Sequence, residues 1–218
     1  MIEFEKMKTQ TVHDLNNIIR IVNQIDEILK NKAGKPFTLL DLLHNQKTSP
    51  LDALIHNERY FELTNLFPNM LWSSLFLTSY SIIEKFLYDI CNSFATHHSI
   101  ELKPNDLAGK GIVRSKNYLI KVMKFQFFEG SPNWMITKNG NYIRNLLMHS
   151  SGVVDVDENK HKKVKNMIRD NPSLDIIDHH IVLSKDYVLL FLSSCIGLVE
   201  EIIGLYEKHI THNQPNAK

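Results

Sequence analysis

The chain has 218 residues, is 43% hydrophobic and 22% charged, and carries a formal net charge of +1. This length suits one large domain or one domain with an appendage, and the composition is that of an ordinary soluble globular protein. The near-neutral charge excludes a polycation, so any contact with nucleic acid has to come from a local patch. The two cysteines, Cys91 and Cys195, lie in apolar helical patterns, which predicts buried thiols in a reducing compartment.

The sequence favours a cytoplasmic protein without membrane contact. Its start, M-I-E-F-E-K-M-K, has no apolar segment of the kind found in signal peptides. The longest apolar run, Tyr187–Val199, is shorter than the ~20 residues needed to cross a bilayer.

Helical periods dominate the first third of the chain. Residues 11–30 place apolar side chains three and four residues apart, a heptad-like seam that we expect to pack on the body of the domain. The stretch 31–36 ends this helix, and a short helix is expected over 37–44. Ser49 followed by Pro50 predicts a capped helix that runs to about residue 66.

The remaining elements are also helical. Pro68-Asn69 is expected to break the pattern and to begin a long core helix that ends near residue 96. A looser stretch over 99–111 precedes a helix from about residue 115. The break at 129–132 caps the next helix, in which Gly140 predicts a kink or a short break before Asn141. We further expect a basic helix over 158–169, a short extended piece over 181–183, and a long final helix over 185–209 capped by Ser184.

The predicted fold class is therefore all-α, an antiparallel helical bundle with an N-terminal helical extension. The extension covers residues 1–68, the bundle 69–212, and a frayed tail 213–218. The sequence leaves the role of the extension open.

The stretch 141–152, N-Y-I-R-N-L-L-M-H-S-S-G, concentrates chemically useful side chains at a predicted helix end. Gly152 can adopt the left-handed conformation that ends a helix. Arg144 offers a fixed cation with a forked set of donors, Asn145 an amide, and His149 the side chain that exchanges protons near neutral pH. Ser150, directly after the histidine, is an accessory candidate.

These residue types suit RNA cleavage without a metal ion. Histidine can take the proton of the 2′-hydroxyl or protonate the leaving oxygen, and arginine can grip the phosphate as charge develops. Arg144 and His149 are five residues apart, roughly 140° around a helix axis, so they can flank a groove or meet the same residues of a second copy about a two-fold axis. On the spacing alone, the simpler interpretation is an exposed arginine and a partly buried histidine near a helix end.

In its context, R-N-L-L-M-H closing a helix between two long core helices, the stretch resembles the HEPN superfamily. The resemblance covers about residues 69–209 and places the catalytic arginine and histidine of that family on Arg144 and His149, and their polar neighbour on Asn145. It implies a metal-independent endoribonuclease that acts at a composite cleft in a homodimer. Many members are toxins or phage-defence effectors with a neutralising antitoxin or regulatory partner, and some have lost activity.

Other residues are candidates for orienting the catalytic side chains or for binding RNA. Glu84, on the first core helix, can orient Arg144 or His149, although a surface carboxylate beside Lys85 is the simpler interpretation. The basic run Lys160, Lys162, Lys163 and Lys165 can hold RNA phosphates or form a solvated helix face.

The sequence contains no known calcium-loop spacing, zinc-type cysteine spacing, Gly-rich phosphate loop or nucleophile elbow, and we expect no metal and no cofactor. The leading hypothesis is an endoribonuclease. The alternative is a catalytically inactive helical module that binds RNA or protein, and a third possibility is an immunity-type partner in which residues 1–68 clasp another chain.

Overall fold

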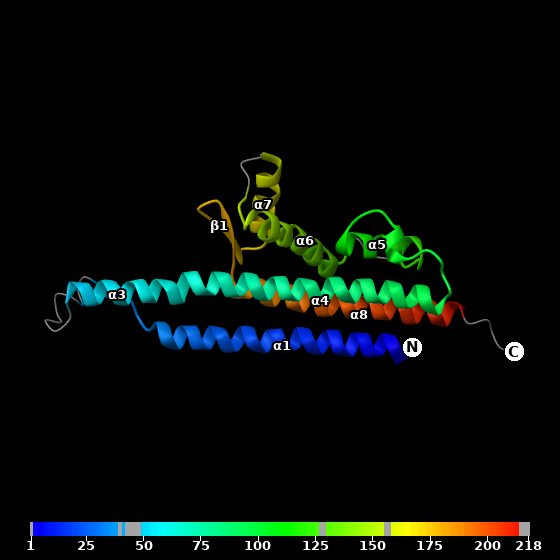
Figure 1. The fold of residues 1–218 in the computed structure, drawn as a ribbon, viewed down its shortest axis with the longest axis horizontal. Coiled ribbons are helices and arrows are strands. Elements are labelled where there is room, and N and C mark those ends of the chain that lie inside the picture. The colour runs from blue at the N-terminus through cyan, green and yellow to red at the C-terminus, as the bar shows by residue number, and fades with distance from the viewer. Residues whose placement is uncertain (1, 39–40, 42–48, 127–129, 155–157, 214–218) are drawn as a thin grey trace.

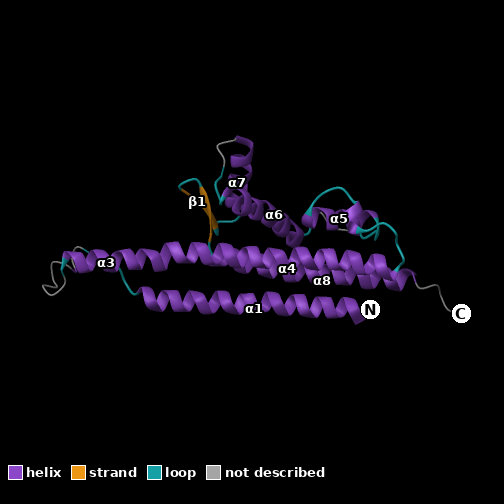
Figure 2. Ribbon diagram, viewed as in Figure 1, coloured by secondary structure: helices purple, strands orange, loops and turns teal. Residues whose placement is uncertain are grey.

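The computed structural model describes residues 2–38, 41, 49–126, 130–154 and 158–213, and within them α-helix dominates (Figures 1 and 2). The only sheet in this part of the chain is a two-stranded hairpin. The all-α prediction is therefore confirmed.

Three long helices form the body of the fold: α1 (Ile2–Ala33), α4 (Phe67–His97) and α8 (Lys185–Asn213). In Figure 1, α1 lies on one side of α4 and α8, and the shorter helices lie on the other. These are α5 (Gly111–Lys121), α6 (Pro132–Ser150) and α7 (Glu158–Asp170). The buried side chains of α4 and α8 thus form the centre of a layered structure.

The helices α4 and α8 run in the same direction. Near their starts, the ring centroids of Phe76 and Tyr187 are 6.0 Å apart, and near their ends those of Phe94 and Tyr206 are 6.3 Å apart. α1 runs the opposite way. The bundle is therefore only partly antiparallel, because the long connection through α5, α6 and α7 lets the chain return parallel to α4.

The helix α1 begins nine residues earlier than the periodicity predicted and packs on the body along its whole length. The ring of Phe4 stacks on Tyr206 at 3.9 Å between centroids, and the predicted seam residues Leu15, Ile18 and Val22 are buried. The prediction that the seam packs on the domain is confirmed. The domain boundary at residue 68 stays a prediction, although one hydrophobic core includes residues on both sides of it.

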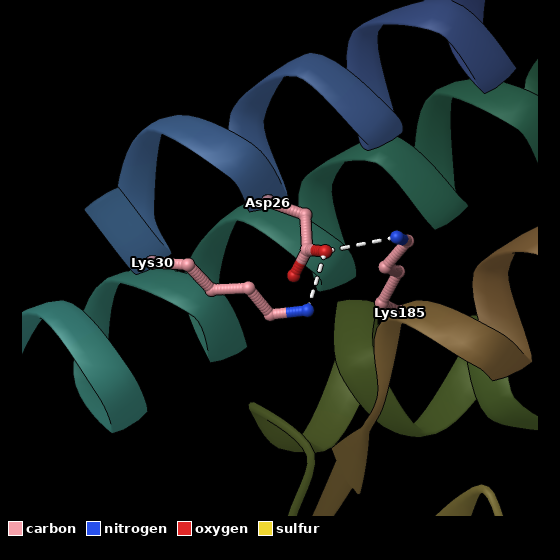
Figure 3. A network of polar contacts seen from close by, with 3 residues as sticks. All are labelled: Asp26, Lys30 and Lys185. Carbon is pink, nitrogen blue, oxygen red and sulfur yellow. Dashed lines mark hydrogen bonds and ion pairs between the residues drawn. The ribbon is translucent and has the colours of Figure 1, made fainter. Parts of the chain in front are cut away.

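A polar contact also joins α1 to α8 (Figure 3). One carboxylate oxygen of Asp26 accepts hydrogen bonds from Lys185 and from Lys30, each at 2.9 Å. Burial opposes ionisation of Asp26, whose side chain is 15% exposed, but these two ammonium groups hold its pKa below the ordinary value.

The predicted break at Pro68 is wrong. α3 (Pro50–Phe61), with Ser49 as its N-cap as expected, continues through a π-helix, η1 (Glu62–Leu66), directly into α4. The backbone N–H of Phe67 bonds the carbonyl of Glu62, five residues back. This wider turn lets a helix accommodate a proline, which lacks an N–H donor. Pro68 therefore occupies the first turn of α4 without interrupting the continuous helix formed by α3, η1 and α4. The short helix expected over 37–44 lies largely outside the described residues.

The final helix, α8, begins as predicted, with the N–H of Tyr187 donating to the Ser184 hydroxyl at 3.2 Å. By length and composition its stretch Lys185–His209 could span a membrane, and half of the most apolar window is buried inside the protein. α8 packs against α1, α4 and α6. The cytoplasmic location stays a prediction, and residues 214–218 of the predicted tail lie outside the described residues.

A short hairpin precedes α8. Strands β1 (Leu174–Ile177) and β2 (His180–Leu183) pair antiparallel, with Leu174 opposite Leu183. The turn residues Asp178 and His179 both have positive φ, 47° and 65°. The extended piece over 181–183 was predicted, whereas its partner β1 was not.

Candidate functional site

The helix that carries the predicted site, α6, is anchored at its start. The Ser131 hydroxyl accepts from the N–H of Trp134 at 3.4 Å, and Pro132 occupies the first turn, as in a well-formed N-terminus. Ser131 and Asn133 also bond the carboxylate of Glu201 on α8. Ser131, in the predicted break at 129–132, therefore both caps α6 and attaches it to the core helix α8.

Of the kink or short break expected before Asn141, the break is absent: α6 runs unbroken from Pro132 to Ser150. Gly140 is needed for packing instead. A Cβ at this position would lie 2.3 Å from Cε2 of Phe191, whose ring is fully buried on α8. The glycine lets α6 and α8 approach closely, a role that periodicity alone does not reveal.

The C-terminal end of α6 is fixed as well. Ser151 ends the helix in the left-handed region with φ 49°, and Gly152 follows with φ 80°, so the predicted left-handed end is formed by two residues. The Gly152 carbonyl then accepts from the N–H of Ile181 at 2.9 Å. Because β2 holds the chain immediately after His149 and Ser150, the helix end has a defined place.

A pocket of about 540 Å³ opens beside the C-terminal half of α6. It brings together every residue predicted to be catalytic or accessory: Arg144, Asn145, His149 and Ser150 from α6, and Glu84 from α4. The rest of its lining comes from Lys110, Gly111, Asn141, Tyr142, Leu146 and Val153. Although Arg144 and His149 are five residues apart, both contribute to this one concave surface.

Among the described residues, Asn145 and Tyr80 lie next to the guanidinium of Arg144. Its Nη1 donates to Oδ1 of Asn145 at 3.0 Å, and its Cζ lies 5.9 Å from the ring centroid of Tyr80 on α4. The Tyr80 hydroxyl in turn donates to Oδ1 of Asn141 at 2.7 Å. Arg144 is thus half-buried at the pocket wall, whereas Asn145 and His149 are exposed.

Glu84 reaches the pocket next to the start of α5. A Cβ on Gly111 would lie 2.3 Å from Oε1 of Glu84, so only a glycine leaves room for the carboxylate there. Gly111 also has φ +54°, which favours glycine. Glu84 lines the pocket with Arg144 and His149, and it also lines a second hollow with Lys85, so both interpretations of this carboxylate stay predictions.

The predicted RNA-binding lysines occupy α7. Lys163 holds its ammonium 4.1 Å from the ring centroid of Tyr142, a pocket residue. Burial, and secondly the charge of Lys138, lower the pKa of Lys163. Lys162 and Lys165 are exposed and do not belong to the pocket lining, and the side chain of Lys160 lies outside the described residues.

The sequence interpretation missed Lys110 and Asn141, which also line the pocket. Asn141 lies one helical turn before Asn145, a spacing that places both on one face and could have indicated it. Lys110 comes from another part of the chain, directly before α5, and nothing in its local sequence points to α6. Tyr80 on α4 is buried, so it packs in the core and does not line the pocket.

Among the described residues, no group of three or more His, Cys, Asp or Glu side chains is arranged to hold a metal ion. Comparison with known proteins gives no match to a family model, to a curated protein or to a solved structure.

Proposed function

We propose that the protein is a HEPN-like endoribonuclease that cleaves RNA without a metal ion. The observation that supports this proposal best is the single pocket lined by Arg144, Asn145 and His149 together with Glu84. It combines a fixed cation, an amide and two groups able to exchange protons in a space of about 540 Å³, which is large enough for a nucleotide-sized ligand.

In the proposed reaction the RNA 2′-hydroxyl attacks the adjacent phosphorus. A base takes the 2′-hydroxyl proton as the new P–O bond forms, and an acid protonates the 5′-oxygen as its bond to phosphorus breaks. Arg144 binds the phosphate and stabilises the charge that develops on its oxygens. The products are a 2′,3′-cyclic phosphate and a 5′-hydroxyl.

Two proton-transfer groups are required, and His149 supplies one. Glu84 lines the same pocket and can supply or orient the other within one chain. The predicted homodimer offers a second route, in which the His149 of another copy completes the site. A toxin or phage-defence role, with a regulatory partner, belongs to the same proposal.

The test is cleavage of RNA by the purified protein in EDTA, with analysis of the product ends. His149→Ala and Arg144→Ala should each lower cleavage by about 100-fold or more, as is typical when an acid–base group or a phosphate ligand is lost. His13→Ala and Arg20→Ala are matched controls, because both residues are exposed on α1, on the other side of the central helices. Undiminished cleavage by both site variants would overturn the assignment.

The alternative, an RNA-binding module without catalysis, is tested in the same preparation. Lys162→Glu with Lys163→Glu should weaken RNA binding and reduce its salt dependence. Lys32→Glu with Lys35→Glu makes the same charge change at exposed positions at the end of α1 and beyond it. Tight, salt-sensitive binding without any cleavage would favour the alternative.

A further inference from the structure

Beneath the pocket lies a tyrosine that the proposed chemistry does not use. Tyr80 is 1% exposed in the middle of α4, which makes it one of the largest fully buried side chains. Its hydroxyl bonds Asn141 at 2.7 Å, and the guanidinium of Arg144 lies 5.9 Å from its ring centroid. One side chain of the core therefore contacts two residues that line the pocket.

We propose that Tyr80 is a positioning residue, which holds the guanidinium of Arg144 against its ring face and fixes Asn141 through its hydroxyl, so that both present their polar groups to a phosphate. That the phosphate belongs to RNA rests on the proposed function. The positioning itself is a property of the free protein.

Arginine has a long side chain that loses much freedom when it is ordered. Here the guanidinium lies over the Tyr80 ring, with Cζ 5.9 Å from the ring centroid, and its Nη1 donates to Oδ1 of Asn145 at 3.0 Å. The bond to Asn145 engages one of five N–H donors, and a phosphate can be bound through the others. A cation held in place before the substrate arrives costs less to order during the reaction.

The surroundings of Tyr80 keep its hydroxyl protonated. Burial, and secondly the nearby carboxylate of Glu84, raise the pKa of Tyr80 well above its ordinary value, although the charge of Arg144 acts the other way. The hydroxyl is therefore a donor at neutral pH and not a base. Its burial also prevents the ring from stacking on a nucleobase, so its influence on substrate passes through Arg144 and Asn141.

The first experiment measures the mobility of the arginine side chains by NMR in the free protein, through the Nε–H signals of the five arginines. The signal of Arg144, assigned by its loss in Arg144→Lys, should show a markedly more restricted Nε–H group than the exposed Arg20. Tyr80→Phe keeps the ring and should preserve this restriction, whereas Tyr80→Leu should release it. An Arg144 as mobile as Arg20 in the unmodified protein would overturn the proposal, even if Tyr80→Leu failed to fold.

The second experiment is kinetic. Tyr80→Leu should lower kcat by about tenfold or more while KM changes little, and Tyr80→Phe should recover most of the loss. Tyr88→Phe is the control, since Tyr88 lies on the same helix and its hydroxyl bonds Asn105, away from the pocket lining. Equal kcat in all three variants would contradict positioning. Absence of cleavage in the unmodified protein would refute the proposed function and leave the NMR result to decide the role of Tyr80.

Discussion

Glu201 of α8 lies at the N-terminus of α6, where its two carboxylate oxygens are 3.0 and 2.8 Å from the Ser131 hydroxyl. Nδ2 of Asn133 donates to the same carboxylate at 2.7 Å. A negative charge at this end of a helix is favourable, because the first N–H groups and the helix dipole are positive there. The hydrogen bond between Asn133 and Glu201, which are 68 residues apart in sequence, thus attaches the helix that carries the candidate site to the core.

Replacement of Glu201 should weaken this attachment. Glu201→Ala removes the charged acceptor of two hydrogen bonds, and we expect a loss of about 1.5–3 kcal/mol in the free energy of unfolding. Denaturant unfolding measures it, with Glu200→Ala, an exposed neighbour on the same helix, as the control. Equal stability of the two variants would show that Ser131 and Asn133 find other partners.

Gly140 gives a second test of how α6 is docked. Gly140→Ala places a methyl group against the buried ring of Phe191, and the resulting overpacking should cost about 1–3 kcal/mol of stability. Gly204→Ala on α8 is the matched control, because no described atom lies within 4 Å of its Cβ position. That variant should gain about 0.5–1 kcal/mol from the better helix propensity of alanine. A stabilised Gly140→Ala would mean that Phe191 moves aside at little cost.

Most helices could be predicted from the sequence because apolar periodicity, and in some cases a capping side chain, is encoded locally. Ser49 and Ser184 begin helices as their side chains indicated. Pro68 misled the interpretation, and Gly140 does not break its helix, since the usual effects of these residues depend on their surroundings. A π-turn accommodates the proline, and a facing aromatic ring accounts for the glycine.

In the candidate site, too, some residues could be predicted from the local sequence and others could not. The residues on α6 were predicted from one short stretch, and Glu84 from its place on the core helix. Lys110 lines the pocket, and Tyr80 lies beneath Arg144, only because the start of α5 and the middle of α4 lie beside α6. Such proximity has no signal in a single sequence.

The contact between Asp26 and Lys185 predicts a pH dependence. The folded protein holds the pKa of Asp26 below the ordinary 3.8, so this carboxylate adds stability above about pH 4. That contribution should disappear as the pH falls through the folded pKa. Asp26→Asn should therefore be less stable than the unmodified protein at pH 7, and the difference should shrink below pH 4. Urea unfolding across pH measures this, and Asp170→Asn, at an exposed ion pair, should show a smaller effect.

Gly111 tests whether Glu84 must occupy the pocket. Gly111→Ala would bring a methyl group to 2.3 Å from Oε1 of Glu84, so the carboxylate has to leave its position. If Glu84 takes part in the proposed reaction, directly or by orienting His149 or Arg144, RNA cleavage should fall by about tenfold or more.

The matched control for this prediction is Gly34→Ala. Gly34 has a similar left-handed φ, +66° against +54°, but no described atom lies within 4 Å of its Cβ position. Both variants should pay about 1–2 kcal/mol for a left-handed alanine, and only Gly111→Ala should also lose cleavage. Cleavage retained by Gly111→Ala, with the stability loss equal to that of the control, would show that the displaced carboxylate has no part in the reaction. The second proton transfer would then have to come from another group, and the His149 of a second copy is the candidate that the dimer hypothesis supplies.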